Sequence, residues 1–207
     1  MWIAPLLLGF TLSAGLIVAI GAQNLFVLQQ GLMRRHVGPV VLFCIGCDVT
    51  LIALGVLGLS KVLAKAPMLA PVLTLCGVAF LAWYGVSAFR RAASTATASA
   101  SRVLTLRGAL GQAAAFTLLN PHVYLDTVLF VGSLGAAQPA LLRPWFILGA
   151  GLASTGWFGA LGYGARLMAP LFARPKAWRV MDAGVGVVML GLAAGLLASL
   201  VRPLLHL

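Results

Sequence analysis

The sequence predicts an all-α integral membrane protein with six transmembrane helices, arranged as two inverted three-helix repeats. The first observation is composition: of 207 residues, 62% are hydrophobic and only 8% are charged, and the mean hydropathy is +1.07. A water-soluble domain needs more polar surface than this composition supplies. The second observation is that apolar runs of about 20 residues, the helix length that crosses a hydrocarbon core of about 30 Å, recur along the chain. The third is a weak likeness between the two halves.

Six apolar runs define the predicted spans. They cover residues 3–28, 38–60, 68–89, 108–134, 144–166 and 180–201. The first run has no basic residue before it and is longer than the apolar part of a signal peptide, so we interpret it as a retained helix.

Basic residues predict the orientation of these spans. The net charge is +11, but the lysines and arginines lie in short loops without interleaved exposed aromatic residues, which argues against a nucleic-acid partner. The loops after the first, third and fifth spans carry ten Lys or Arg residues, and the opposite side carries four. The positive-inside rule therefore places those three loops in the cytoplasm and both termini outside it.

A polar segment at residues 92–101 separates three spans from three. We predict a first repeat at 1–91, a cytoplasmic linker at 92–107 and a second repeat at 108–207. Short strings match between the halves: Gln23-Asn24 with Asn120-Pro121, Ala53-Leu54-Gly55 with Ala160-Leu161-Gly162, and Gly77-Val78 with Gly184-Val185. Because three is an odd number of spans, the repeat would be inverted, as in many secondary transporters. Chance recurrence in a chain rich in Gly and Ala is the alternative.

Two of the three acidic residues lie at membrane depth. Asp48 is about ten residues into the second span, and Asp126 lies in the second half of the fourth. A charge there costs about 2.5–3.5 kcal/mol on insertion scales and usually marks a substrate or ion pathway. We predict that both bind substrate and couple its movement to protons. The alternative is a neutral or paired Asp that fixes packing. Asp182, at the start of the sixth span, fits a helix N-terminus.

Pro121 predicts a break in the fourth span, because proline removes a backbone donor and disfavours a helical residue before it. Asn120 can then cap a new half-helix whose first residue is Pro121. The freed N-terminus carries partial positive charge and suits a carboxylate. Tyr124 shares a helix face with Asn120, and His122 shares another with Asp126.

The first span carries the corresponding polar residues, and we place its break at Gly21. Gln23 and Asn24 are amides where lipid favours Leu, and we expect them to satisfy backbone groups that the break frees. The alternative is that they only form hydrogen bonds between helices. We predict a site between the first, second and fourth spans. Besides the two acids, its predicted binding residues are Gln23, Asn24, Asn120 and Tyr124.

Cys44 and Cys47 form a C-x-x-C pair beside Asp48, which raises the alternative of a membrane thiol–disulfide carrier. A redox thiolate is normally activated by a helix N-terminus or a nearby cation. Here the pair lies inside a helix next to a carboxylate, so we favour small apolar side chains that fill space. The spacing of His, Cys and acidic residues predicts no metal site, no cofactor and no catalytic triad.

Three stretches resemble the LysE/ArgO family of basic amino-acid exporters within the LysE superfamily. They are Gly21-Ala22-Gln23-Asn24 with the following Phe26-Val27-Leu28, Asp48 with Leu51-Ile52 and Gly55, and Asn120-Pro121-His122-Val123-Tyr124-Leu125-Asp126-Thr127. The likeness spans nearly the whole chain. The chain departs from the family pattern at Gln29 and Met33, where many members carry a basic residue, and at Cys47, where many carry Ser.

The resemblance implies export of L-lysine and L-arginine across the bacterial inner membrane by a protein that is not an enzyme. Expelling a cation against an inside-negative potential costs about 2.3 kcal/mol per charge per 100 mV, so we expect proton antiport. Another small amino acid or cationic solute is an alternative substrate, and a channel or scaffold is an alternative function. The sequence does not decide whether lysine or arginine is the preferred substrate, which ion is coupled, or whether the chain forms a homodimer.

Overall fold

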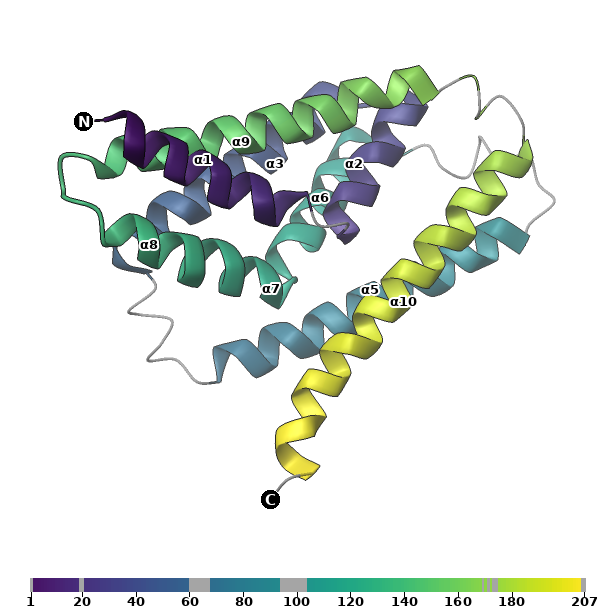
Figure 1. Ribbon diagram of the computed structural model, residues 1–207. Coiled ribbons are helices and arrows are strands. Elements are labelled where there is room, and N and C mark those ends of the chain that lie inside the picture. Colours follow the sequence, from purple (N-terminus) through teal and green to yellow (C-terminus); the bar gives the residue numbers. More distant parts are fainter. Residues whose placement is uncertain are drawn as a thin grey trace.

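The computed structural model describes residues 2–18, 21–59, 68–93, 104–168, 170, 172 and 175–205. Within these ranges every regular element is a helix (Figure 1). The first half contains α1 (Ile3–Ile17), α2 (Ala22–Met33), α3 (Val37–Leu54), the π-helical turn η1 (Gly55–Leu59) and α5 (Leu69–Ala93). The second half contains α6 (Leu106–Leu118), α7 (Pro121–Val123), the π-helix η3 (Tyr124–Val131), α8 (Gly132–Ala136), α9 (Arg143–Gly164), the 3-10 turn η4 (Ala165–Met168) and α10 (Pro175–Leu205).

The first and fourth predicted spans are bent pairs of helices and not single helices. Helices α1 and α2 meet at 82°, and α6 meets the segment from Pro121 to Ala136 at 62°. Three further helices are each long and apolar enough to cross a membrane, within Val37–Gly58, Arg143–Met168 and Lys176–Leu200. Up to five candidate spans therefore exist in the described part of the chain. Helix α5 covers the third predicted span, and the six-span repeat stays a prediction.

Several expected features lie outside the described residues. Most of the predicted linker, residues 94–103, is among them. So are Lys61 and Lys65, two of the four basic residues that the orientation prediction places on the side opposite the cytoplasm.

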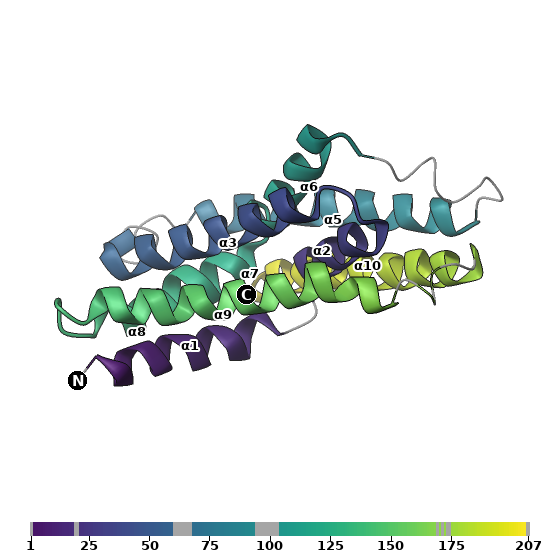
Figure 2. The same ribbon diagram turned by 90° about the horizontal axis from the view of Figure 1, so that it is seen from above.

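The long helices pack in pairs. Helix α1 runs along α9, and α5 runs along α10, as the two views in Figures 1 and 2 agree. Helix α3 also packs on α9. The main core joins these pairs through buried side chains that include Phe26 of α2, Phe116 of α6 and Met189 of α10.

Glycine permits the closest helix contact. A Cβ added at Gly149 of α9 would overlap the carbonyl oxygen of Leu6, and one added at Gly9 of α1 would overlap that of Phe146. The two backbones thus touch where larger residues would hold them apart, as small residues allow in membrane proteins.

Replacing Gly149 with Ala is expected to lower stability by about 1–3 kcal/mol, because the added methyl group overpacks a backbone contact. The matched control is Gly156→Ala on the same helix, where a Cβ meets no atom within 4 Å. The measurement is the melting temperature of each variant in detergent. Equal melting temperatures for the two variants would contradict the packing of α1 on α9.

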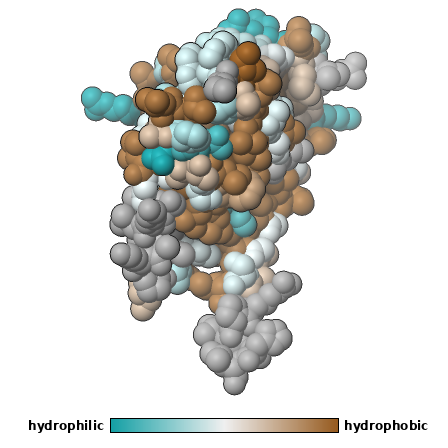
Figure 3. Space-filling view, turned by 60° about the vertical axis from the view of Figure 1, so that its left-hand side comes forward, coloured by the Kyte–Doolittle hydropathy of each residue, from teal (hydrophilic) through white to brown (hydrophobic). Residues whose placement is uncertain are grey.

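The outer surface is apolar. Large hydrophobic side chains stand exposed on several helices, such as Leu42 (70%), Leu57 (75%) and Val187 (63%). Figure 3 shows hydrophobic residues over most of one face, with strongly hydrophilic residues mainly in its upper half. Such a surface suits contact with lipid and not with water.

Candidate functional site

The two helix breaks border one cavity of about 350 Å³. This volume lies in the lower part of the range of about 300–1,000 Å³ that is typical of small-molecule sites. Six of the residues predicted from the sequence line it: Gly21, Gln23, Asn24, Asp48, Asn120 and Asp126. The cavity extends beyond the three predicted spans, because side chains of α5, α9 and α10 also line it.

At the first break, Asn24 satisfies a backbone group that the end of α1 leaves free. Its Nδ2 donates to the carbonyl oxygen of Ile17 at 2.8 Å, and its Oδ1 accepts from Trp157 Nε1 at 3.3 Å. Gly21 is the N-cap of α2, in an extended conformation. Gln23 also lines the cavity, and its side-chain amide lies beside the Cys44 thiol. Asn24 therefore holds the bend.

At the second break, Asn120 has an extended backbone and caps the helix that follows. Its Oδ1 accepts from the backbone N–H of His122 at 3.1 Å, with Pro121 as the first helical residue. Helix α5 comes close here, since a Cβ at Gly77 would overlap the carbonyl oxygen of Leu119. The helix start is thus fixed by its own cap and by the backbone of α5.

Tyr124 lies outside the residues that line the cavity. Its hydroxyl donates to the carbonyl oxygen of Leu118 at 2.9 Å, across the break. This hydrogen bond parallels the one from Asn24 to Ile17. In both cases a side chain after the break donates to a backbone carbonyl group near the end of the helix before it. Tyr124 thus supports the bend and does not face the cavity. The π-helix that begins at Tyr124 was not predicted from the sequence.

The two carboxylates face the cavity in different surroundings. Asp48 Oδ2 accepts a hydrogen bond of 3.0 Å from Ser154 Oγ of α9. Asp126 is exposed and makes no hydrogen bond or ion pair with another described residue. None of the residues that line the cavity is Lys or Arg. The two acidic side chains of the cavity therefore have no Lys or Arg among the described lining residues to balance their charge.

Sequence reasoning missed several polar residues that line the cavity: Ser13, His122, Thr127 and Ser154. Ser154 is 1% exposed, and Ser13 Oγ has no hydrogen-bond partner in the described part of the chain. Ser154 and Thr155 are the only Ser or Thr residues in α9, and this was the available signal. Which of them faces inward depends on the rotation of the helix, which an apolar sequence on all sides does not reveal.

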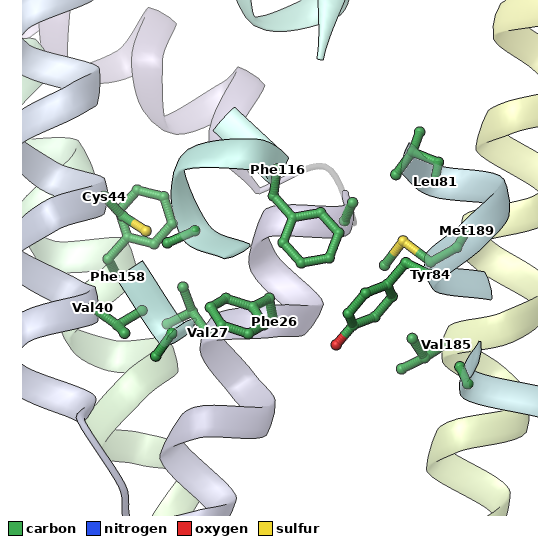
Figure 4. Close-up of a cluster of buried hydrophobic side chains, with 14 of the residues drawn as sticks. Phe26, Val27, Val40, Cys44, Leu81, Tyr84, Phe116, Phe158, Val185 and Met189 are labelled. Atoms are coloured by element: carbon green, nitrogen blue, oxygen red, sulfur yellow. The ribbon is translucent and has the colours of Figure 1, made fainter. Parts of the chain in front are cut away.

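The cysteine pair does not form a disulfide in this structure. Cys44 is fully buried in the core, where Phe158 lies beside it in Figure 4. Cys47 is only partly buried. The surroundings of Cys44 match those of a small apolar side chain.

Comparison with known proteins finds a matching protein family. The profile described as LysE type translocator matches residues 14–200. The chain is similar to the arginine exporter protein ArgO of Serratia proteamaculans, with 44% identity over 194 residues, which is 92% of this chain and 95% of that protein. It is also similar to the arginine exporter protein ArgO of Yersinia enterocolitica, with 41% identity over 190 residues, or 90% and 93% of the two chains. No solved structure matches the chain.

Proposed function

The chain belongs to the LysE type translocator family, and from that premise we propose that it exports L-arginine and L-lysine across the bacterial inner membrane in exchange for protons. It is a multi-pass membrane protein, and the family points to a transporter and not to an enzyme. Relatives that match most of its length carry the name arginine exporter, which favours an amino acid with a cationic side chain.

The observation that carries the proposal is the pair of carboxylates on one cavity without a balancing Lys or Arg. Asp48 and Asp126 bind the side-chain cation of the substrate. A carboxylate at membrane depth is costly, and an opposite charge offsets that cost. A neutral amino acid would not offset it, so the cavity prefers basic ones.

The second helix break offers the matching group for the α-carboxylate of the substrate. Asn120 keeps its Nδ2 available, because its Oδ1 is the atom that caps His122 N–H. The helical segment from Pro121 to Ala136 starts at the same place, and a helix start attracts anions. Gln23 supplies a further side-chain amide on this cavity.

Proton antiport follows from the same carboxylates. After the substrate leaves, Asp48 and Asp126 lose their cation and become stable by taking protons from the outside. The protons move inward with the membrane potential and supply the energy for the cation that moves outward.

Equivalent contacts in the two halves support an inverted repeat. The halves are 1–91 and 108–207, joined through 92–107. Gly31 of α2 packs on the backbone of Gly162 in α9, and Gly132 packs on that of Gly55 after α3. Gly55 and Gly162 are the last residues of the matching Ala-Leu-Gly strings.

The basic parts of the sequence gather at one end of the molecule. There lie the ends of α2, α5 and α9 and the start of α10 (Figure 1). We assign that end to the cytoplasm and both termini to the outside.

Growth and efflux test the proposal. Bacteria that lack their own arginine exporter and express this chain should tolerate a toxic arginine analogue, or a lysine-containing dipeptide, better than cells with an empty vector. Proteoliposomes loaded with labelled arginine should release it faster when the outside is made acidic, because protons then exchange inward. Equal growth with and without the gene, together with no release from proteoliposomes, would refute the proposal.

A further inference from the structure

A second, smaller polar cavity lies beside α2, α5 and α10. Its volume is about 60 Å³, and its polar side chains are Gln29, Gln30, Arg91, Gln112 and Asp182. We call it the Asp182 pocket. Helix α2 connects the two cavities, because its first residues line the large one and its last turns line the small one. The Asp182 pocket lies toward the end of α2 that carries Arg34 and Arg35, which we assign to the cytoplasm.

Asp182 is buried in this pocket, and the expectation that it serves a helix N-terminus is wrong. Helix α10 begins at Pro175, so Asp182 is in its third turn and only 1% exposed. Its Oδ1 lies 3.7 Å from Arg91 Nε of α5. The Arg91 guanidinium carbon also lies 5.3 Å from the centroid of the Tyr84 ring. The guanidinium group thus lies beside a carboxylate and an aromatic face, both of which attract such a cation.

Gln30 lies in the Asp182 pocket with a buried side-chain donor that lacks a hydrogen bond. It is 2% exposed, yet its Nε2 has no hydrogen-bond partner in the described part of the chain. Its neighbour Gln29 differs, because Gln29 Oε1 accepts from Tyr84 OH at 3.1 Å. Buried donors are nearly always bonded, so a buried unpaired amide that lines a cavity points to a ligand with an acceptor group. The pocket therefore offers a carboxylate for a cation and an amide donor for an anion.

Aromatic side chains separate the two cavities. Phe116 lies with its ring centroid 5.4 Å from Phe26, 4.9 Å from Phe80 and 4.8 Å from Tyr84. Figure 4 shows Phe26, Phe116 and Tyr84 gathered between α2, α5 and α6. Two of these side chains, Phe26 and Tyr84, also line the Asp182 pocket. The cluster lies between the residues of α2 and α5 that line the large cavity and those that line the pocket.

We propose that the Asp182 pocket is a second, cytoplasmic binding site for the exported basic amino acid, and that Arg91 occupies it in this structure as an internal competitor of the substrate cation. This inference rests on the function proposed above. At about 60 Å³ the pocket is far below the roughly 300 Å³ of a small-molecule site, so a whole amino acid enters only when Arg91 leaves. The substrate cation then takes the place of Arg91 at Asp182 and Tyr84, and its carboxylate accepts from Gln30.

The test is uptake of labelled arginine into inverted membrane vesicles, whose outer face is the cytoplasmic one. Asp182→Asn removes the carboxylate and should raise KM about tenfold or more, as expected when a charged partner is lost. Arg91→Gln removes the competitor and should lower KM roughly three- to tenfold, because a larger fraction of the protein is then competent to bind. The matched control is Arg90→Gln, since the neighbouring arginine is exposed and should leave KM unchanged.

Opposite shifts in KM are the signature of competition. A merely structural ion pair would instead reduce kcat or the amount of protein in both variants, without lowering KM in Arg91→Gln, and that result would overturn the inference. If Asp182→Asn fails to accumulate, Gln30→Met, which keeps the size but removes the donor, should raise KM about threefold or more. An unchanged KM there would likewise refute the site. Vesicles of the unchanged protein that take up no arginine would refute the proposed function itself.

Discussion

Replacement of Asp48 by Asn is expected to reduce arginine efflux about 100-fold, the size of effect seen when one partner of a buried charge pair is removed. Asp48 is held by Ser154 and faces the cavity, where Asn would keep the shape but lose the charge. Because one group is proposed to bind both substrate and proton, the variant loses recognition and coupling together. The measurement is the release of labelled arginine from preloaded cells.

Ser154→Ala is the matched control for Asp48→Asn. It removes one hydrogen bond to the carboxylate and keeps its charge, so efflux should fall only about three- to tenfold. Comparable amounts of each variant in the membrane establish that folding is intact. Efflux from Asp48→Asn equal to that of the unchanged protein would remove Asp48 from the site.

Replacement of Asp126 by Asn is expected to change which amino acid is exported. Asp126 is not engaged by another described residue, so its charge is available to the substrate cation. Without it, efflux of arginine should fall about tenfold or more, while citrulline, which has nearly the shape of arginine without its charge, should be exported at least as well as by the unchanged protein. The measurement is the ratio of labelled arginine to labelled citrulline released from the same cells.

Asp126→Glu is the control, because it keeps the charge and should keep the preference for arginine. An equal loss of arginine and citrulline efflux in Asp126→Asn would show that the residue supports the fold and does not select the substrate by its charge.

The sequence predicts the outline of the site because its polar residues are rare in an apolar chain. Pro121 must interrupt a helix, and an acid at membrane depth needs a polar environment, so both pointed to the cavity. The size of each bend does not follow from these residues. It depends on tertiary contacts, such as the approach of α5 to the second break at Gly77 and the hydrogen bond from Asn24 to Ile17.

Other parts of the site could not be predicted because they depend on how helices are rotated. Helix α9 is apolar on all sides, so its sequence does not reveal which face packs on α3. The hydrogen bond between Ser154 and Asp48, more than 100 residues apart in the sequence, therefore could not be predicted. Tyr124 was expected at the site because it shares a helical face with Asn120, but Asn120 is an extended N-cap outside the helix. The Tyr124 hydroxyl donates instead to the carbonyl oxygen of Leu118 across the break. Asp182 was misread because α10 begins earlier than its apolar run.

The most direct test of the central claim, that a basic amino acid binds in the cavity between the two helix breaks, is equilibrium binding of labelled arginine to the purified protein in detergent. The unchanged protein should bind it saturably, lysine should compete, and the double variant Asp48→Asn with Asp126→Asn should lose the saturable component that belongs to the large cavity, so that any binding left disappears when Asp182→Asn is added. Binding by the double variant with unchanged affinity and unchanged capacity would contradict the account, since the large cavity would then contribute no binding.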